Sequence, residues 1–276
     1  YAFNTILVSK GNPVSNAGKP SSSSDWSSWS PPHPDWSVYV DPFYTTNYLT
    51  GGSTLATYLQ NVGFTFRTAA DLQNWMQQNI SSGRAPRTVL VMAQDIVPNT
   101  VASSASSSAL IRQYLNAGGN ILWMGEVPMY YQGQPNGSMV TWGTNGQVQV
   151  LGLPNGSTYW YANQPLQVTS AGQGYGLGIN PWWTSPLSTR ANVSYCWLQP
   201  LATIGNGGIA AWRMPYWPLP PDCNKGNQYI QDARRENAPG FIRIYDAPVN
   251  MSSNQYLVST LMVAGQLAGW YRGQAP

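Results

Sequence analysis

The sequence is short of charge. Of its 276 residues, 13 are Lys or Arg, 10 are Asp or Glu and one is His, so that 8% are charged, against about 25% in an average soluble domain. The net charge of +3 and the scatter of the basic residues exclude a typical nucleic-acid-binding protein. Aromatic residues make up 13% of the chain, and this excludes a solvated, disordered chain.

Long apolar runs and lysines are also scarce. No apolar run reaches the roughly 18 residues of a transmembrane helix, so the sequence predicts a protein that does not span a membrane. Lysine occurs three times, and neutral polar residues take the place of surface charge. The chain begins at Tyr1, as we expect of a mature chain after removal of a signal peptide. These features predict a secreted or cell-surface protein.

The two cysteines, Cys196 and Cys223, allow two interpretations. In an oxidising compartment they would form one disulfide that closes a loop of about 27 residues and contributes roughly 3 kcal/mol. The alternative is a pair of buried free thiols. Two Cys and one distant His do not supply the four ligands of a structural metal site, and no phosphate-binding loop is present. We therefore expect no metal and no cofactor.

Five Asn-x-Ser sequons predict N-glycosylation. Their asparagines are Asn79, Asn136, Asn155, Asn192 and Asn250. Asn136 and Asn155 each lie in a Pro-Asn-Gly-Ser segment, which is typical of an exposed turn. The sequons agree with an extracellular glycoprotein.

Strand-like and helix-like segments alternate along much of the chain. Helical spacing of apolar residues predicts helices over residues 51–62, 69–78, 103–116 and 254–270, the third starting in a serine run, and apolar runs predict strands over residues 64–67, 88–93, 120–125 and 241–245. This alternation is typical of βαβ units. The predicted class is α/β, with a mostly parallel sheet flanked by helices. Residues 1–132 and 241–276 would form this core. Residues 133–240 would form a β-rich, loop-rich elaboration with short strands such as residues 147–151 and 208–214.

One stretch resembles a known family. Thr88-Val-Leu-Val-Met-Ala-Gln-Asp95, followed by the helix that leads through Gly118-Gly119 into the strand ending near Glu126, resembles the class I glutamine amidotransferase-like fold. It looks most like the non-catalytic relatives, the trimerisation domains of some β-galactosidases and the trehalose-utilisation type of domain, over about residues 50–130. The resemblance implies a flavodoxin-like arrangement. It implies no thiol chemistry, because the turn after the strand, residues 93–95, has no Cys.

Three acids are candidates for catalysis. Asp95 and Glu126 each follow a predicted strand, and ligands of parallel sheets bind outside the carboxyl ends of the strands. On adjacent strands the two carboxylates could reach the roughly 5 to 9.5 Å separation of glycoside hydrolases. Asp246 is a third candidate. The alternative is structural: each acid caps a helix or pairs with an arginine. No Gly-x-Ser-x-Gly elbow indicates a serine hydrolase.

Aromatic residues in loop-like segments are the most unusual feature. Candidates for contact with glycans or with another subunit are Trp160, Trp182, Trp183 and Trp217. Packing of long loops against the body is the alternative. The preferred prediction is a structural, self-assembling surface glycoprotein, with copies of itself as partners. A secreted carbohydrate-active enzyme and a glycan-binding module remain the alternatives.

Overall fold

The computed structural model describes residues 33–45, 49–125, 127–153, 166–177, 199–205, 208–214, 240–244, 249–250 and 254–268. The helices in these ranges are α2 (Gly52–Asn61), α3 (Ala69–Ser81), η2 (Ala85–Arg87), α4 (Leu110–Asn116), α5 (Thr144–Gly146), η3 (Gln147–Leu151), α6 (Ser170–Gly174) and α8 (Asn254–Leu267). The strands of the main sheet are β1 (Trp36–Tyr39), β3 (Thr65–Arg67), β4 (Val89–Met92), β6 (Asn120–Trp123), β9 (Leu166–Val168), β10 (Gln199–Ile204), β11 (Ile209–Met214) and β12 (Phe241–Arg243). Smaller sheets contain β2 (Leu49–Thr50), β5 (Val97–Pro98), β7 (Tyr131–Gly133), β8 (Met139–Thr141) and β13 (Val249–Asn250).

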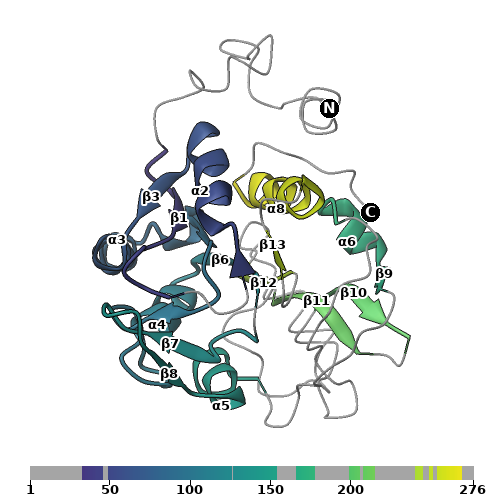
Figure 1. The fold of residues 1–276 in the computed structure, drawn as a ribbon. Coiled ribbons are helices and arrows are strands. Elements are labelled where there is room, and N and C mark those ends of the chain that lie inside the picture. The colour runs from purple at the N-terminus through teal and green to yellow at the C-terminus, as the bar shows by residue number, and fades with distance from the viewer. Residues whose placement is uncertain are drawn as a thin grey trace.

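An eight-stranded mixed sheet runs through the described residues in the order β3-β1-β4-β6-β12-β11-β10-β9. The five strands from β3 to β12 are parallel to their neighbours. The last three strands continue the sheet antiparallel. The α/β class with a mostly parallel sheet is therefore confirmed, and Figure 1 shows its parallel part beside the antiparallel strands β10 and β11.

Helices cover both faces of the sheet because its strands are apolar on both sides. Along β4, Val89 and Val91 belong to one core cluster, together with residues of α2 and α8. Leu90 and Met92 belong to a second cluster, together with residues of α3 and α4. All four side chains are buried, as expected for a parallel strand covered on both faces. The molecule is thus a three-layer α/β/α sandwich around two cores.

Local signals explain several of the elements. At the start of α3, the Thr68 hydroxyl accepts a hydrogen bond from the Asp71 amide, the usual N-cap arrangement. After α4, Gly118 has φ of +92°, a conformation that glycine adopts without strain. The predictions for α2, β3, α3, β4, β6, β11, β12 and α8 are confirmed within a few residues at each end.

Two predictions are wrong. Residues 103–109 are turns and bends, and α4 begins only at Leu110, without a side-chain cap. Ser106 Oγ accepts from the Ser108 amide, and such local bonds compete with helix formation. Gln147–Leu151 forms a π-helical turn instead of a strand. The Gly152 amide donates to the Val148 carbonyl at 3.0 Å, so this backbone bond closes a helical turn instead of joining a neighbouring strand.

A small sheet lies beside the main one. It has the order β5-β7-β8, with β5 and β7 parallel and β7 and β8 antiparallel. β7 and β8 form a hairpin around the Pro135-Asn136-Gly137 turn. Among the described residues, no helix is long and apolar enough to cross a membrane.

Candidate functional site

The strand order indicates where a ligand would be expected, at the carboxyl ends of the parallel strands. Strands β1, β3, β4, β6 and β12 are the first to fifth parallel strands along the chain, and they lie side by side in the order second, first, third, fourth, fifth. The connections leaving β1 and those leaving β4 therefore run in opposite directions. Ligands of open α/β sheets bind at such a switch point, outside the carboxyl ends of the strands. Here that point lies between the ends of β1 and β4.

Asp41 and Gln94 fill the switch point. Asp41 follows β1 and is buried. Its Oδ1 accepts from the Phe43 amide at 3.0 Å, and its Oδ2 accepts from the Ala69 amide at the start of α3 at 2.9 Å. Gln94 follows β4, and its Oε1 accepts from the Asp41 amide at 2.9 Å while its Nε2 donates to the carbonyls of Asp41 and Tyr44. Both side chains hold the chain's own backbone.

Asp95 is used in the same way. Its side chain is fully buried, and Oδ2 accepts from the Leu49 amide at 3.1 Å, which ties β2 to the end of β4. Gly125, after the neighbouring strand β6, packs directly on Asp95, and a side chain at Gly125 would collide with it. We name Asp41, Gln94 and Asp95 the carboxyl-edge network. The other two candidate acids, Glu126 and Asp246, lie outside the described residues.

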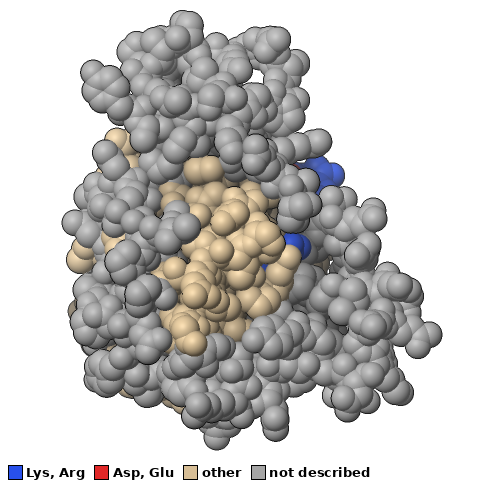
Figure 2. All heavy atoms as spheres, turned by 90° about the vertical axis from the view of Figure 1, so that its right-hand side faces the viewer, with Lys and Arg blue, Asp and Glu red and all other residues tan. Residues whose placement is uncertain are grey.

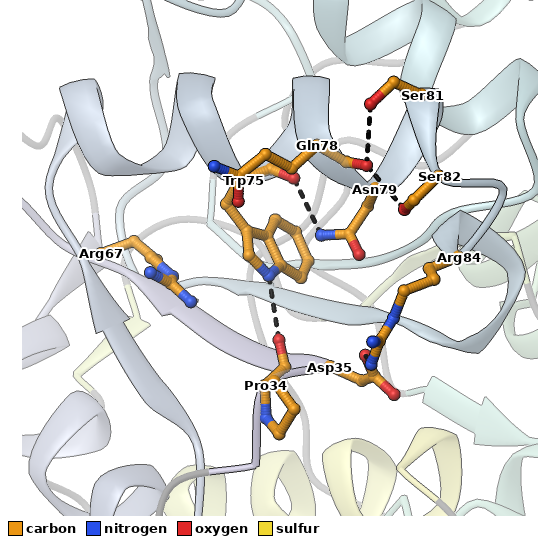
Figure 3. A pocket seen from close by; sticks show the side chains of 9 residues that line it. All are labelled: Pro34, Asp35, Arg67, Trp75, Gln78, Asn79, Ser81, Ser82 and Arg84. Atoms are coloured by element: carbon orange, nitrogen blue, oxygen red, sulfur yellow. Dashed lines mark hydrogen bonds and ion pairs between the residues drawn. The ribbon is translucent and has the colours of Figure 1, made fainter.

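A second region of interest is a surface hollow of about 460 Å³ against α3, which we name the α3 hollow. It lies between the start of β1, the end of β3 and the C-terminal half of α3 with the loop that follows. Its lining includes Asp35, Arg67, Trp75, Gln78, Asn79 and Arg84. Figure 3 shows Arg67 on one side of the Trp75 ring and the Asp35–Arg84 pair on the other.

The Trp75 ring is held in place from two sides. Its Nε1 donates to the Pro34 carbonyl at 3.0 Å, and the Arg67 guanidinium carbon lies 5.9 Å from the ring centre, within cation–π range. Asp35 accepts from Arg84 Nη2 at 2.6 Å and lies 3.7 Å from Arg87 Nη2. The hollow is therefore a polar, charged site with an aromatic floor.

The β7–β8 hairpin forms a third region. All three residues of β8 are exposed, including Met139 at 36% and Val140 at 45%. Phe43, in the loop after β1, is 72% exposed. The same loop reaches the hairpin, because the Thr45 hydroxyl donates to the Gly137 carbonyl at 2.5 Å.

The structure separates two of the predicted glycosylation sites. Asn136 is exposed in the hairpin turn, and its Oδ1 accepts from the amide and the hydroxyl of Ser138. Its Nδ2, the atom that carries an N-glycan, has no hydrogen-bond partner among the described residues. Asn79 is buried, and its Nδ2 donates to the Trp75 carbonyl at 2.8 Å. This geometry speaks against a glycan on Asn79, because the side chain is buried and its nitrogen is held inside α3.

Several other predicted site residues cannot be placed. Asn155, Asn192, Cys196, Cys223, Trp160, Trp182, Trp183 and Trp217 lie outside the described residues. For Asn250 the structure describes the backbone in β13. Within the described part of the chain, no group of three or more His, Cys, Asp or Glu residues is arranged to hold a metal ion.

The comparison with known families covers most of the chain. The model of the MJECL34 family matches residues 36–271. The chain belongs to the MJECL34 family. The matched range starts at the first residue of β1 and ends beyond α8, so the whole three-layer sandwich lies within it.

A relative within the MJECL34 family is known from an archaeon. The protein MJECL34 of Methanocaldococcus jannaschii is 29% identical over 188 residues, which make up 64% of this chain and 55% of that protein. The chain thus spans about half the length of the curated relative it matches.

Most of the residues in these three regions of this MJECL34-family chain were not predicted from the sequence. Asp41 was not identified because β1, which precedes it, lies at the end of a Ser- and Pro-rich segment. Gln94 was not identified because its side chain carries no ionisable group, although the preceding strand β4 was predicted. The Asp35–Arg84 pair joins residues 49 positions apart, so no local motif reveals it. The β8 strand Met139–Thr141 has only three residues, too few for a period-2 pattern.

Proposed function

We propose that this MJECL34-family protein is a non-catalytic, self-assembling glycoprotein of the cell surface or extracellular space. The observation that carries the proposal is that β8 is an edge strand among the described residues, with exposed apolar side chains and no charged residue or proline in the strand. Natural edge strands usually carry a charged residue or a proline, which hinders pairing with another chain.

The hydrogen-bond pattern of the hairpin determines which backbone groups of β8 are available to pair with another strand. The Trp142 amide donates to the Tyr130 carbonyl, and the Gln134 amide donates to the Ser138 carbonyl. Since bonded pairs alternate along antiparallel strands, Gln132 and Val140 form the bonded pair between them. The amide and carbonyl groups of Met139 and Thr141 therefore point away from β7. A strand of a second copy would pair with them.

The surroundings of the edge favour a second copy of the chain as its partner. Phe43 adds an apolar side chain on the loop that contacts the hairpin turn. The net charge of +3 on 276 residues gives little repulsion between copies. The low charge extends to the side of the molecule away from β8: Figure 2 views the right-hand side of Figure 1, and the described residues visible there include no acidic side chain and Arg only at the margin of the patch.

The saturated carboxyl-edge network supports a role without catalysis. At the point where this strand order places ligands, Asp41, Gln94 and Asp95 all bind backbone groups of the chain itself and are buried. A glycosidase carboxylate has to contact its substrate, and Asp95 has no solvent exposure.

The strand order also supports a finer statement about the fold. We propose a flavodoxin-like, amidotransferase-like arrangement, because second-first-third-fourth-fifth is the order of flavodoxin-like sheets. This agrees with the resemblance of residues 50–130 to non-catalytic amidotransferase-like domains, and it leaves the antiparallel strands β9, β10 and β11 as an addition to that plan.

Light scattering against protein concentration tests the self-assembly. Val140→Lys places a charge on the open edge, and we expect it to raise the concentration needed for assembly at least tenfold, about 1.4 kcal/mol. Tyr58→Lys adds the same charge on α2, at a side chain of similar exposure, 38%, and should leave assembly unchanged. A wild-type chain that stays monomeric at all concentrations would contradict the proposal, as would equal effects of both variants.

A further inference from the structure

The α3 hollow contains an arginine whose hydrogen-bonding capacity is largely unused. Arg67, the last residue of β3, donates from Nε to the Ser37 hydroxyl at 3.3 Å. Its two terminal amino groups have no hydrogen-bond partner among the described residues, and they lie at the hollow beside Trp75 (Figure 3). Half-burial lowers the pKa of this guanidinium, an effect that the nearby Asp71 carboxylate opposes. The charge is therefore only partly solvated, and a ligand that accepts from both amino groups would stabilise it.

The charges around the hollow set the charge of that ligand. Arg84 is neutralised by Asp35, which it contacts at 2.6 Å. Arg67 and Arg84 line the hollow with one acid, Asp35. Just outside the lining, Arg87 adds a positive charge near Asp35 and Asp71 adds a negative charge near Arg67, so that the sum is one positive charge. A monoanion matches this excess, whereas a dianionic phosphate would be repelled by the Asp35 carboxylate. The planar fork of Arg67 suits a carboxylate, which it can bind through two parallel hydrogen bonds.

The rest of the lining offers neutral hydrogen-bonding groups. The Ser81 and Ser82 hydroxyls both donate to the Gln78 carbonyl, so their oxygens keep lone pairs for an incoming donor. Asn79 uses its Nδ2 within α3, and its Oδ1 accepts no hydrogen bond among the described residues. The side-chain amide of Gln78 is exposed at the rim. Amides and hydroxyls in this number are suited to a ligand that carries several hydroxyl groups.

The volume of the hollow limits the size of the ligand. About 460 Å³ lies toward the lower end of small-molecule sites and fits one or two sugar rings. We propose that the α3 hollow binds a uronic acid residue, with its carboxylate on the Arg67 guanidinium and its hydroxyl groups on Ser81, Ser82 and Asn79. This site does not depend on self-association through β8, so that either proposal can fail alone.

NMR titration of the full chain tests the proposal. The probes are galacturonate, the neutral sugar galactose and inorganic phosphate, and the reporter is the indole N–H signal of Trp75, assigned by its loss in Trp75→Phe. We expect galacturonate to shift this signal in a saturable way, and galactose and phosphate to bind at least tenfold more weakly. No saturable shift with galacturonate, or equal binding of galactose or phosphate, would overturn the proposal.

Three variants separate direct contact from general electrostatics. Arg67→Met removes the guanidinium and keeps the apolar stem, and should weaken galacturonate binding at least tenfold. Arg87→Gln removes a positive charge that lies near Asp35 but outside the lining, and should change affinity no more than twofold. Equal losses in the two variants would overturn the proposal. Should Arg67→Met fail to fold, Gln78→Glu, on the exposed rim, is expected to cause the tenfold loss by repulsion, and unchanged binding in that variant would overturn it.

Discussion

The carboxyl edge of the sheet and the α3 hollow use their polar side chains differently. At the carboxyl edge, Asp41 and Gln94 are buried, and the described bonds of both run to the backbone of the loop after β1 and to the start of α3. At the α3 hollow, Arg67 is half-buried and Gln78 is exposed, and their terminal groups have no partner among the described residues. At the carboxyl edge, where the strand order predicts a ligand, the polar side chains are occupied by the chain's own backbone. At the α3 hollow, where it predicts none, polar groups remain available to a ligand.

This difference follows from what each region has to hold. Where the chain leaves β1 and where it enters α3, the amides of Asp41 and Ala69 take part in buried hydrogen bonds. Buried amides need acceptors, and Asp41 and Gln94 supply them. The hollow lies beside the outer strand β3, and the terminal groups of Arg67 and Gln78 there have no hydrogen-bond partner among the described residues.

Glycan occupancy is expected to show the largest contrast between a closed and an open position. Asn136, an exposed residue whose Nδ2 has no partner among the described residues, should carry a glycan when the chain is made by a glycosylating host, and Asn79, with its Nδ2 bonded inside α3, should not. Peptide mass spectrometry checks both sites. Asn136→Gln should remove one glycan mass and Asn79→Gln none. A glycan found on Asn79 in folded protein would break the comparison.

Removal of an acid at the carboxyl edge is expected to have the largest effect on stability. Asp41→Ala leaves the buried Ala69 amide and the partly buried Phe43 amide without their acceptor, and should lower the free energy of unfolding by about 3 kcal/mol. Asp71→Ala is the matched control, because Asp71 is an exposed acid in the first turn of the same helix. It should cost about 0.5 kcal/mol. Urea unfolding measures both, and similar losses would show that the network contributes no more than the surface.

Two buried tyrosines sharpen the comparison further. The Tyr114 hydroxyl bonds with Thr88 Oγ1, so Tyr114→Phe should cost about 1 kcal/mol. The Tyr39 hydroxyl is buried and has no hydrogen-bond partner within the described residues. Tyr39→Phe should therefore leave stability unchanged or raise it by up to about 1 kcal/mol. A loss in Tyr39→Phe as large as that in Tyr114→Phe would contradict this assignment.

The same tyrosines predict an alkaline limit. Burial raises the pKa of both Tyr39 and Tyr114, and the Asp41 carboxylate raises that of Tyr39 further. Above about pH 10 the unfolded chain releases these protons while the folded chain retains them, so stability falls as pH rises, by about 1.4 kcal/mol per unit for each residue. Urea unfolding at pH 9 and pH 11 should show a smaller fall in Tyr39→Phe than in the wild type. An equal fall would contradict the assignment.

Changes in the hollow are expected to affect stability least. Arg67→Met removes a bond to Ser37 and a ring contact with Trp75, and should lower the free energy of unfolding by less than about 1 kcal/mol. Thermal unfolding measures the effect. A loss as large as that of Asp41→Ala would mean that Arg67 is a structural residue, like those of the carboxyl edge.

The sequence predicted the fold better than the sites. The apolar runs of β4 and β6 and the helical spacing of α3 are strong local patterns, and they led to the correct class. The predicted helix over the serine run before α4 was wrong because the serine hydroxyl groups form local hydrogen bonds. The alternating pattern of Gln147–Leu151 suggested a strand, but the segment folds into the helical turn η3, which buries Gln147, Val150 and Leu151. Asp95 was placed correctly at a strand end, but its bond to Leu49 depends on a contact 46 residues away that no local pattern contains. The exposure of Phe43 and Val140 could not be predicted from local sequence either, because it depends on the tertiary packing of the β7–β8 hairpin.

Hydrogen exchange at β8 tests the central claim most directly. The Val140 amide faces β7 and should be protected at every protein concentration, whereas the Met139 and Thr141 amides face the open edge. If a second copy pairs with this edge, protection of Met139 and Thr141 will rise with protein concentration and disappear in Val140→Lys. Unchanged, rapid exchange of these two amides in assembled protein would contradict assembly through β8.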